Sequence, residues 1–92
     1  MKPEVLLELL ESTADQLGIR VTYEPLQSTV VHGGLCKVKG EYRIIIDKRA
    51  TMEERIATLA TALGRFDISE LEVPPQVREL VRVHKVTPRT AA

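Results

Sequence analysis

The chain has 92 residues, of which 43% are hydrophobic and 28% charged, and its 13 basic residues balance its 13 acidic ones. This length provides for one hydrophobic core and no second one, and the composition is that of a globular protein rather than a disordered one. A neutral chain has no overall attraction to nucleic acid or to an anionic membrane, so binding of either kind would need a local basic patch.

The chain contains a single cysteine, Cys36, which excludes an internal disulfide. The sequence therefore gives no sign of an oxidising compartment, and a reducing cytosol fits it better. The N-terminus places an acidic residue early and has only a short apolar stretch, unlike a signal peptide. No run approaches the roughly 18 consecutive apolar residues of a membrane span. We expect a cytoplasmic protein.

The first predicted element is a helix over residues 3–17. Its core-facing stripe consists of Val5, Leu6, Leu9, Leu10, Ala14 and Leu17. Pro3 suits the first helical position, and Gly18 suits the left-handed residue after the last turn. A half-buried strand is predicted next, over residues 19–24, with one apolar face made of Ile19, Val21 and Tyr23.

Residues 25–29 are predicted to form a loop. A second strand is predicted to begin at Val30-Val31, where Gly33-Gly34 would introduce a bulge or bend. Residues 35–47 indicate a hairpin that turns at Lys39-Gly40-Glu41. Because a one-residue slip exchanges the two faces of a strand, we let the apolar pattern decide the register. A three-residue turn then groups Cys36, Val38, Tyr42, Ile44 and Ile46 on one face. Cys36 is therefore expected to point into the core.

Residues 51–54, Thr-Met-Glu-Glu, predict the capping box of a second long helix. Apolar residues follow at helical spacing, namely Ile56, Leu59, Ala60, Leu63 and Phe66. Pro74-Pro75 blocks that helix and starts a third one, over about residues 75–84, with one side made of Val77, Leu80, Val81 and His84. We expect a single domain over residues 1–86 and a disordered C-terminal tail over residues 87–92.

The predicted order is helix, three strands, helix and helix. Helices on one face of a small, mostly antiparallel three-stranded sheet define a two-layer α+β domain.

The segment from Ile44 to Arg65 resembles the core of the ImmA/IrrE-type zinc peptidases and other minimal gluzincins. In those proteins a strand leads through a short loop into a helix that reads roughly T-L-A-H-E-L-G-H. The residues that match this frame are Thr58, Leu59, Ala60, Leu63 and Gly64. The resemblance covers about a quarter of the chain, and it implies a minimal zincin-like core.

The chemistry of that motif is missing at three positions. The motif binds zinc through two histidines one helical turn apart, and the glutamate between them acts as general base. This chain has Thr61, Ala62 and Arg65 there. Threonine is a very poor zinc ligand, alanine transfers no proton, and arginine stays cationic and repels a metal. We therefore expect no zinc peptidase activity, and we assign no catalytic, metal-binding or cofactor-binding residue.

Other residues suggest weaker alternatives. Cys36 and His32 could form a nucleophile and its base, but along an extended strand they lie about 13 Å apart. An inert, buried cysteine is the favoured interpretation. Together with His84 these two residues could also ligate zinc, although their spacing matches no known framework.

Several cations follow one another along the predicted hairpin, namely Lys37, Lys39, Arg43, Lys48 and Arg49. Readers of single-stranded nucleic acid also need exposed aromatic side chains, on which the bases stack. All three aromatic residues, Tyr23, Tyr42 and Phe66, fall on predicted apolar faces. A solvated sheet surface is therefore the favoured interpretation, because lysine and arginine are mostly surface residues.

We expect a non-catalytic binding or regulatory module that acts through protein–protein contacts, with a protein partner or a second copy of itself, and without cofactor or membrane. Two alternatives stay open. One is a small enzyme or metal-dependent domain that uses Cys36, His32 or His84. The other is a nucleic-acid binder that uses the hairpin 37–49.

Overall fold

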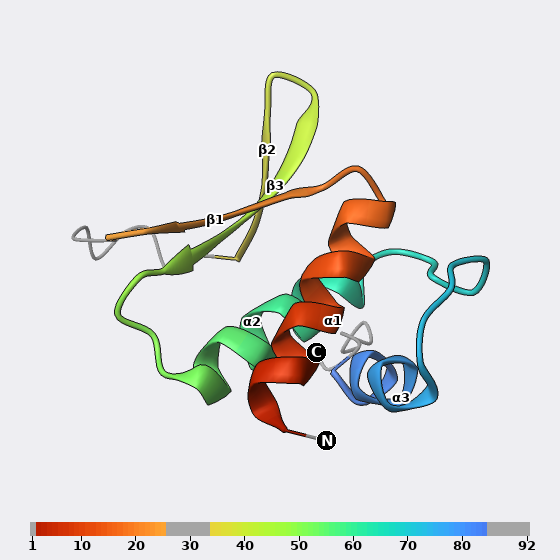
Figure 1. Ribbon diagram of the computed structural model, residues 1–92. Coiled ribbons are helices and arrows are strands. Elements are labelled where there is room, and N and C mark those ends of the chain that lie inside the picture. Colours follow the sequence, from red (N-terminus) through yellow and green to blue (C-terminus); the bar gives the residue numbers. More distant parts are fainter. Residues whose placement is uncertain (1, 26–33, 85–92) are drawn as a thin grey trace, which may run out of the picture.

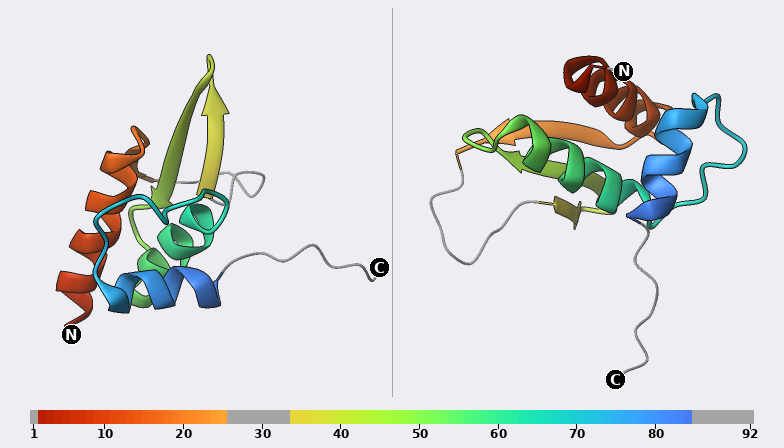
Figure 2. Two further views of the ribbon diagram at one scale, coloured as in Figure 1. Left: turned by 90° about the vertical axis from the view of Figure 1, so that its right-hand side faces the viewer. Right: turned by 90° about the horizontal axis from the view of Figure 1, so that it is seen from below.

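The computed structural model describes residues 2–25 and 34–84. Its elements follow in the order α1 (Pro3–Gln16), β1 (Arg20–Glu24), β2 (Gly34–Val38), β3 (Glu41–Asp47), α2 (Met52–Leu63) and α3 (Pro75–Val83). All three helices lie on one side of the sheet (Figures 1 and 2). The expected two-layer α+β architecture is confirmed, and the helices occupy nearly the residues that the sequence predicts for them.

The sheet has the strand order β1-β3-β2, so that β3 is the central strand. β2 and β3 are antiparallel because a tight turn joins them, whereas β1 runs parallel to β3. The sheet is therefore mixed, and not mostly antiparallel as expected. The sequence pattern favours pairing each strand with its neighbour along the chain, but here β1 pairs with the strand after next.

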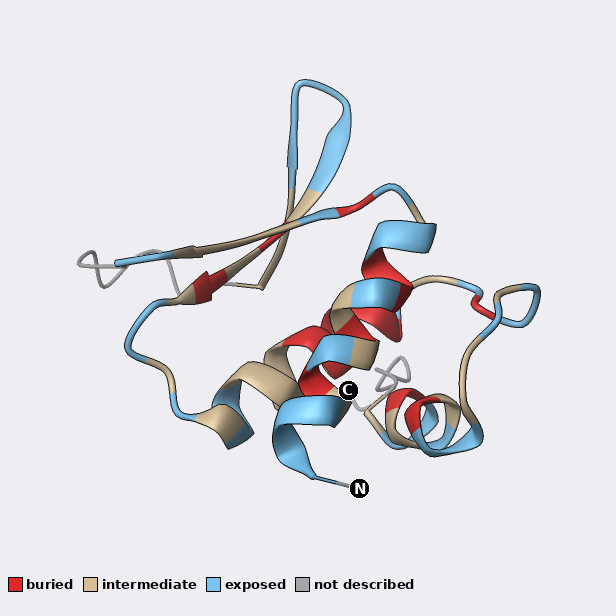
Figure 3. Cartoon of the chain, viewed as in Figure 1, coloured by how far each residue is buried: buried red, intermediate tan, exposed pale blue. Residues whose placement is uncertain are grey.

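The hydrophobic core lies between the inner face of the sheet and the helices (Figure 3). Its largest fully buried apolar side chains are Leu10, Ile44, Ile46, Leu59, Leu63 and Val77. The predicted stripe of α1 is partly wrong, since Val5 is 43% exposed while Leu7 is buried. The reason is that α1 contacts α2, α3 and β1. These three elements together cover a wider part of the helix surface than the predicted stripe.

The expected hairpin register is wrong. Val38 pairs with Glu41 and Cys36 with Arg43, so the turn consists of two residues, Lys39 and Gly40. Both have positive φ, 52° and 83°, as a two-residue turn of type I′ requires. Turn geometry therefore overrides the apolar pattern.

One consequence is that Cys36 and Val38 lie on the outer face of the sheet, opposite to the helices. Residues directly across from each other share a face, so Cys36 goes with Arg43, and Leu35 goes with the buried Ile44. Cys36 is half-buried and does not belong to the core cluster. Residues 37–42 are exposed, because the end of the hairpin projects beyond the helical layer (Figures 1 and 3).

The capping box at the start of α2 is confirmed. The backbone N–H of Glu54 donates to Thr51 Oγ1 at 3.1 Å, and the backbone N–H of Thr51 donates to Glu54 Oε1 at 2.9 Å. The expected strand start at Val30-Val31, the greater part of the predicted loop and the C-terminal tail lie outside the described residues. Within residues 2–25 and 34–84, none of the helices combines the length and the apolar character that crossing a bilayer requires.

Candidate functional site

Thr61, Ala62 and Arg65, the three residues that were compared with the peptidase motif, lie close together in the structure. Thr61 and Ala62 lie in the last turn of α2, and α2 packs against β2 and β3 as expected. Arg65 lies just beyond the C-terminal residue of the helix, where its backbone N–H donates to the carbonyl of Ala62 at 3.1 Å. Ala62 is buried, whereas the side chains of Thr61 and Arg65 reach the surface.

These three residues line a groove of about 490 Å³ between α2 and the beginning of β2, which we call the α2–β2 groove. The described residues that line it are Gly34, Leu35, Ala57, Thr58, Thr61, Ala62 and Arg65. The alanines and Leu35 make one part of the wall small and apolar. Thr58, Thr61 and Arg65 follow at spacings of three and four residues, so they form one polar row along the helix.

The hydrogen-bonding groups of that polar row have no partner in the described part of the chain. Neither the hydroxyls of Thr58 and Thr61 nor the guanidinium of Arg65 makes a hydrogen bond or ion pair there. Thr13 of α1 behaves differently, because its hydroxyl donates to the carbonyl of Leu9 at 2.8 Å within its own helix. The groove thus offers two hydroxyls and one cation to a ligand, and Arg65 is the one charged residue among the described residues that line it.

The other wall of the groove belongs to β2, which is an edge strand of the described sheet. In an antiparallel pair, alternate residues direct their N–H and C=O groups at the partner strand. The two-residue turn makes Val38–Glu41 a hydrogen-bonded pair, so Cys36–Arg43 is one as well. Leu35 and Lys37, the two residues that flank Cys36, therefore direct their backbone groups away from β3, at the outer edge of the described sheet.

The opposite edge of the sheet, at β1, carries a polar network. The Tyr23 hydroxyl donates a hydrogen bond to the Glu11 carboxylate of α1. The Arg55 guanidinium of α2 lies 5.1 Å from the centre of the Tyr23 ring. Burial, together with the bond to Glu11, raises the pKa of the Tyr23 hydroxyl far above its usual value. The network ties β1 to both long helices.

Arg55 also fixes the loop between β3 and α2. Its Nε donates to the carbonyl of Ala50 and its Nη2 to that of Lys48, both at 3.1 Å. These bonds hold the start of α2 against the end of the sheet.

The residues proposed for nucleophilic or metal chemistry do not form a site in the described structure. Cys36 lies on the outer face of the sheet, whereas His84 follows α3 in the helical layer. The Nδ1 atom of His84 lies 3.0 Å from the carbonyl of Leu80 in its own helix. His32 lies outside the described residues. In residues 2–25 and 34–84, no group of three histidine, cysteine or carboxylate side chains is placed to hold a metal ion.

The hairpin cations do not share one face either. Lys37 pairs across the hairpin with Tyr42 and its ammonium lies 5.3 Å from the centre of that ring, whereas Arg43 lies on the other face beside Cys36. Tyr42 lies on the same face as Ile44, as predicted, but it is 40% exposed because it lies near the end of the hairpin. Its ring also contacts Phe66 edge-on, with 5.2 Å between the ring centres.

Comparisons with protein-family models, with curated proteins and with solved structures found no match for this chain. The function of the groove is therefore inferred from its geometry alone. Sequence reasoning located Thr61, Ala62 and Arg65 but missed Ala57, Gly34 and Leu35. The spacing of Thr58, Thr61 and Arg65 was the available signal, and only the sheet order shows which strand lies beside it.

Proposed function

We propose that this protein is a non-catalytic binding module that acts through protein–protein contacts. The site would be the α2–β2 groove, where β2 takes up an extended segment of a partner as an additional strand. The observation that carries the proposal is that β2, an edge strand of the described sheet, lies beside a ligand-sized groove.

Strand addition supplies affinity through main-chain hydrogen bonds and specificity through pockets for alternate side chains. The backbone groups of Leu35 and Lys37 offer two donors and two acceptors at the edge. A residue of the added strand that points toward the helices would enter the groove. There it would meet the methyl groups of Ala57 and Ala62 and the hydroxyls of Thr58 and Thr61.

Charge defines the partner more closely. Arg65 lines the groove, Lys37 lies further along β2 and Lys39 lies in the turn after it, while no carboxylate of residues 2–25 and 34–84 lines the groove wall. Complementary charge favours encounter with an acidic segment and discriminates against a basic one. The preferred partner is therefore an extended acidic segment with a small apolar residue near its middle.

The resemblance of α2 to the zinc peptidases also supports the α2–β2 groove as the binding site. Those enzymes act on polypeptides, and their motif positions correspond to the three residues that line this groove. With threonine, alanine and arginine at these positions, the groove keeps a place for a polypeptide and lacks the groups that would cleave it.

The test begins with the selection of ligands from a displayed library of random heptapeptides, whose affinities are then measured by fluorescence anisotropy. We expect the selected peptides to be rich in aspartate and glutamate. Arg65→Gln should lower the affinity of the protein for these peptides. Mass spectrometry should find the peptides intact after incubation with the protein, both with and without zinc. A set of peptides without acidic residues would contradict the assigned partner chemistry, and cleavage would contradict the absence of catalysis.

A matched pair of variants tests strand addition itself. Lys37→Ala removes the side-chain charge but keeps the outward backbone N–H, whereas Lys37→Pro removes both. One backbone hydrogen bond contributes about 0.5–1.5 kcal/mol, so the proline variant should bind about twofold to tenfold more weakly than the alanine variant. Equal affinities of the two variants would rule out a strand at this edge.

A further inference from the structure

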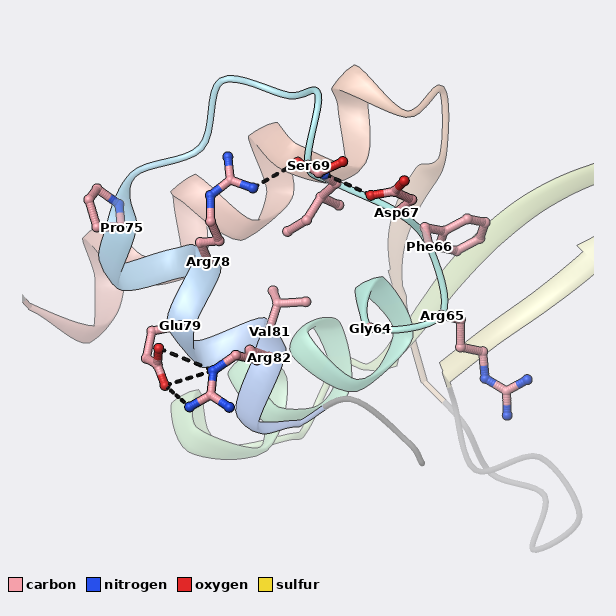
Figure 4. Close-up of a pocket in the computed structure, with 11 residues that line it drawn as sticks. Gly64, Arg65, Phe66, Asp67, Ser69, Pro75, Arg78, Glu79, Val81 and Arg82 are labelled. Atoms are coloured by element: carbon pink, nitrogen blue, oxygen red, sulfur yellow. Dashed lines mark hydrogen bonds and ion pairs between the residues drawn. The ribbon is translucent and has the colours of Figure 1, made fainter. Parts of the chain in front are cut away.

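A second cavity, of about 590 Å³, lies between the end of α2, the connection over residues 64–74, and α3 (Figure 4). We call it the α3 pocket. Its volume falls within the range of about 300–1,000 Å³ that is typical of small-molecule sites. Its interior is mostly apolar, and it includes Ile68 and Val81, which are both buried, together with Gly64 and Pro75.

Arg78 holds one wall of this pocket in place. Its Nη1 donates to the carbonyl of Ile68 at 3.1 Å, and its Nη2 donates to that of Leu71 at 3.0 Å. These bonds fasten the connection onto α3. They engage two of the five N–H donors of the guanidinium, so three donors are left for other partners.

The charges around the pocket are unequally compensated. Arg82 forms an ion pair with Glu79, and Asp67 accepts a hydrogen bond from the backbone N–H of Ser69 at 3.0 Å. Arg65 also lines the pocket, but its guanidinium points away from Arg78 and toward β2 (Figure 4). Arg78 is half-buried, and among residues 2–25 and 34–84 it has carbonyl partners but no carboxylate.

A cation that is partly removed from water and lacks a counter-ion attracts an anion more strongly than a fully solvated one does, because screening is weaker there. An apolar floor beside such a cation fits a ligand with two unlike ends. We propose that the α3 pocket binds an amphipathic anion, whose alkyl chain packs on Ile68 and Val81 and whose carboxylate lies beside Arg78. This site shares Arg65 with the wall of the α2–β2 groove, but it does not depend on the function proposed for that groove.

Three probes with the same eight-carbon chain test the proposal, namely octanoate, octan-1-ol and octylammonium. Binding is followed by NMR titration of the methyl groups of Ile68 and Val81. We expect saturable shifts with octanoate, affinity at least threefold lower with the alcohol, and no saturation with the ammonium. Equal affinity for all three, or shifts centred elsewhere in the protein, would overturn the proposal, as would the absence of binding.

Two exposed neighbours provide variants that leave the connection and the pocket floor untouched. Glu79→Gln removes a carboxylate and releases Arg82, so octanoate should bind about threefold more tightly. Arg82→Gln leaves Glu79 unpaired near the anion, so octanoate should bind about threefold more weakly. Val83→Ala is the matched control, since Val83 is 63% exposed on α3 and does not line the pocket. If the affinity for octanoate changed in the same direction in both charge variants, the proposed contact would be refuted.

Discussion

The free edge of β2 can be tested by placing proline at two adjacent positions of the strand. The ladder geometry directs the backbone N–H of Cys36 at Arg43 and that of Lys37 away from the sheet. Proline removes the N–H at either position and restricts the backbone in the same way. The two variants therefore differ mainly in whether a ladder hydrogen bond is lost.

The expected difference in unfolding free energy between the two proline variants is the contribution of one ladder hydrogen bond. Cys36→Pro removes the donor and leaves the carbonyl of Arg43 without its partner, which costs about 1–3 kcal/mol. A chain of this length is expected to have an unfolding free energy of about 5–14 kcal/mol, so the loss is a substantial fraction of it. Lys37→Pro breaks no backbone hydrogen bond of the β2–β3 ladder and should cost less by that amount.

Urea unfolding, followed by circular dichroism, measures both variants. Each proline variant is compared with alanine at the same position, which removes the contribution of the side chain. The midpoint for Cys36→Pro should fall about 1 M or more further below its alanine reference than the midpoint for Lys37→Pro does. If Lys37→Pro were the more damaging change, the assignment of the free edge would be wrong, and the proposed strand addition would fail with it.

Further predictions concern the helices, the core and two titratable or reactive side chains. Thr51→Ala removes the cap of α2 and should lower the unfolding free energy by about 1 kcal/mol in the same urea assay, and no change would argue against the capping box. Leu63→Ala creates a cavity at a fully buried position and should cost about 2–5 kcal/mol, whereas a cost below about 1 kcal/mol would contradict its place in the core. The folded-state pKa of Tyr23 is raised, so the unfolded chain releases this proton first, near its usual pKa of 10.0; stability is therefore fully present below pH 10 and falls as the pH rises above it. Tyr23→Phe should flatten that alkaline decline, and an unchanged decline would refute the assignment. Cys36 is half-buried on the outer face, so a thiol reagent should modify it without denaturant, and protection until unfolding would place it in the core instead.

The helices were predictable because their signals are local. Pro3 and Gly18 bracket α1, and the capping box of Thr51 and Glu54 starts α2, each within a few residues of the atoms that it acts on. The inner face of the central strand was also predictable, since Ile44 and Ile46 have apolar side chains that need burial. Such features depend on hydrogen bonds and spacing along one segment.

The candidate groove could be predicted only in part. The motif frame placed Thr61, Ala62 and Arg65 together near the end of a helix, but it said nothing of the strand beside them. β2 is an edge strand because β3 lies between β2 and β1. The residues of β2 alone do not indicate this strand order. The α3 pocket was missed altogether, because Arg78 reaches the carbonyl of Ile68 across ten residues of irregular connection and helix.

The sequence by itself determined the α+β class, the three helices and the absence of the peptidase motif, because each follows from composition, periodicity or residue identity at one place. The tertiary structure decided the hairpin register and the parallel pairing of β1 with β3. It also decided the exposure of Tyr42 and the position of Cys36 on the outer face. In the hairpin, an apolar pattern and a turn preference disagreed, and the left-handed backbone at Lys39 and Gly40 decided between them. A face of a strand is buried only where another layer covers it, and the helices end before they reach the tip of this hairpin.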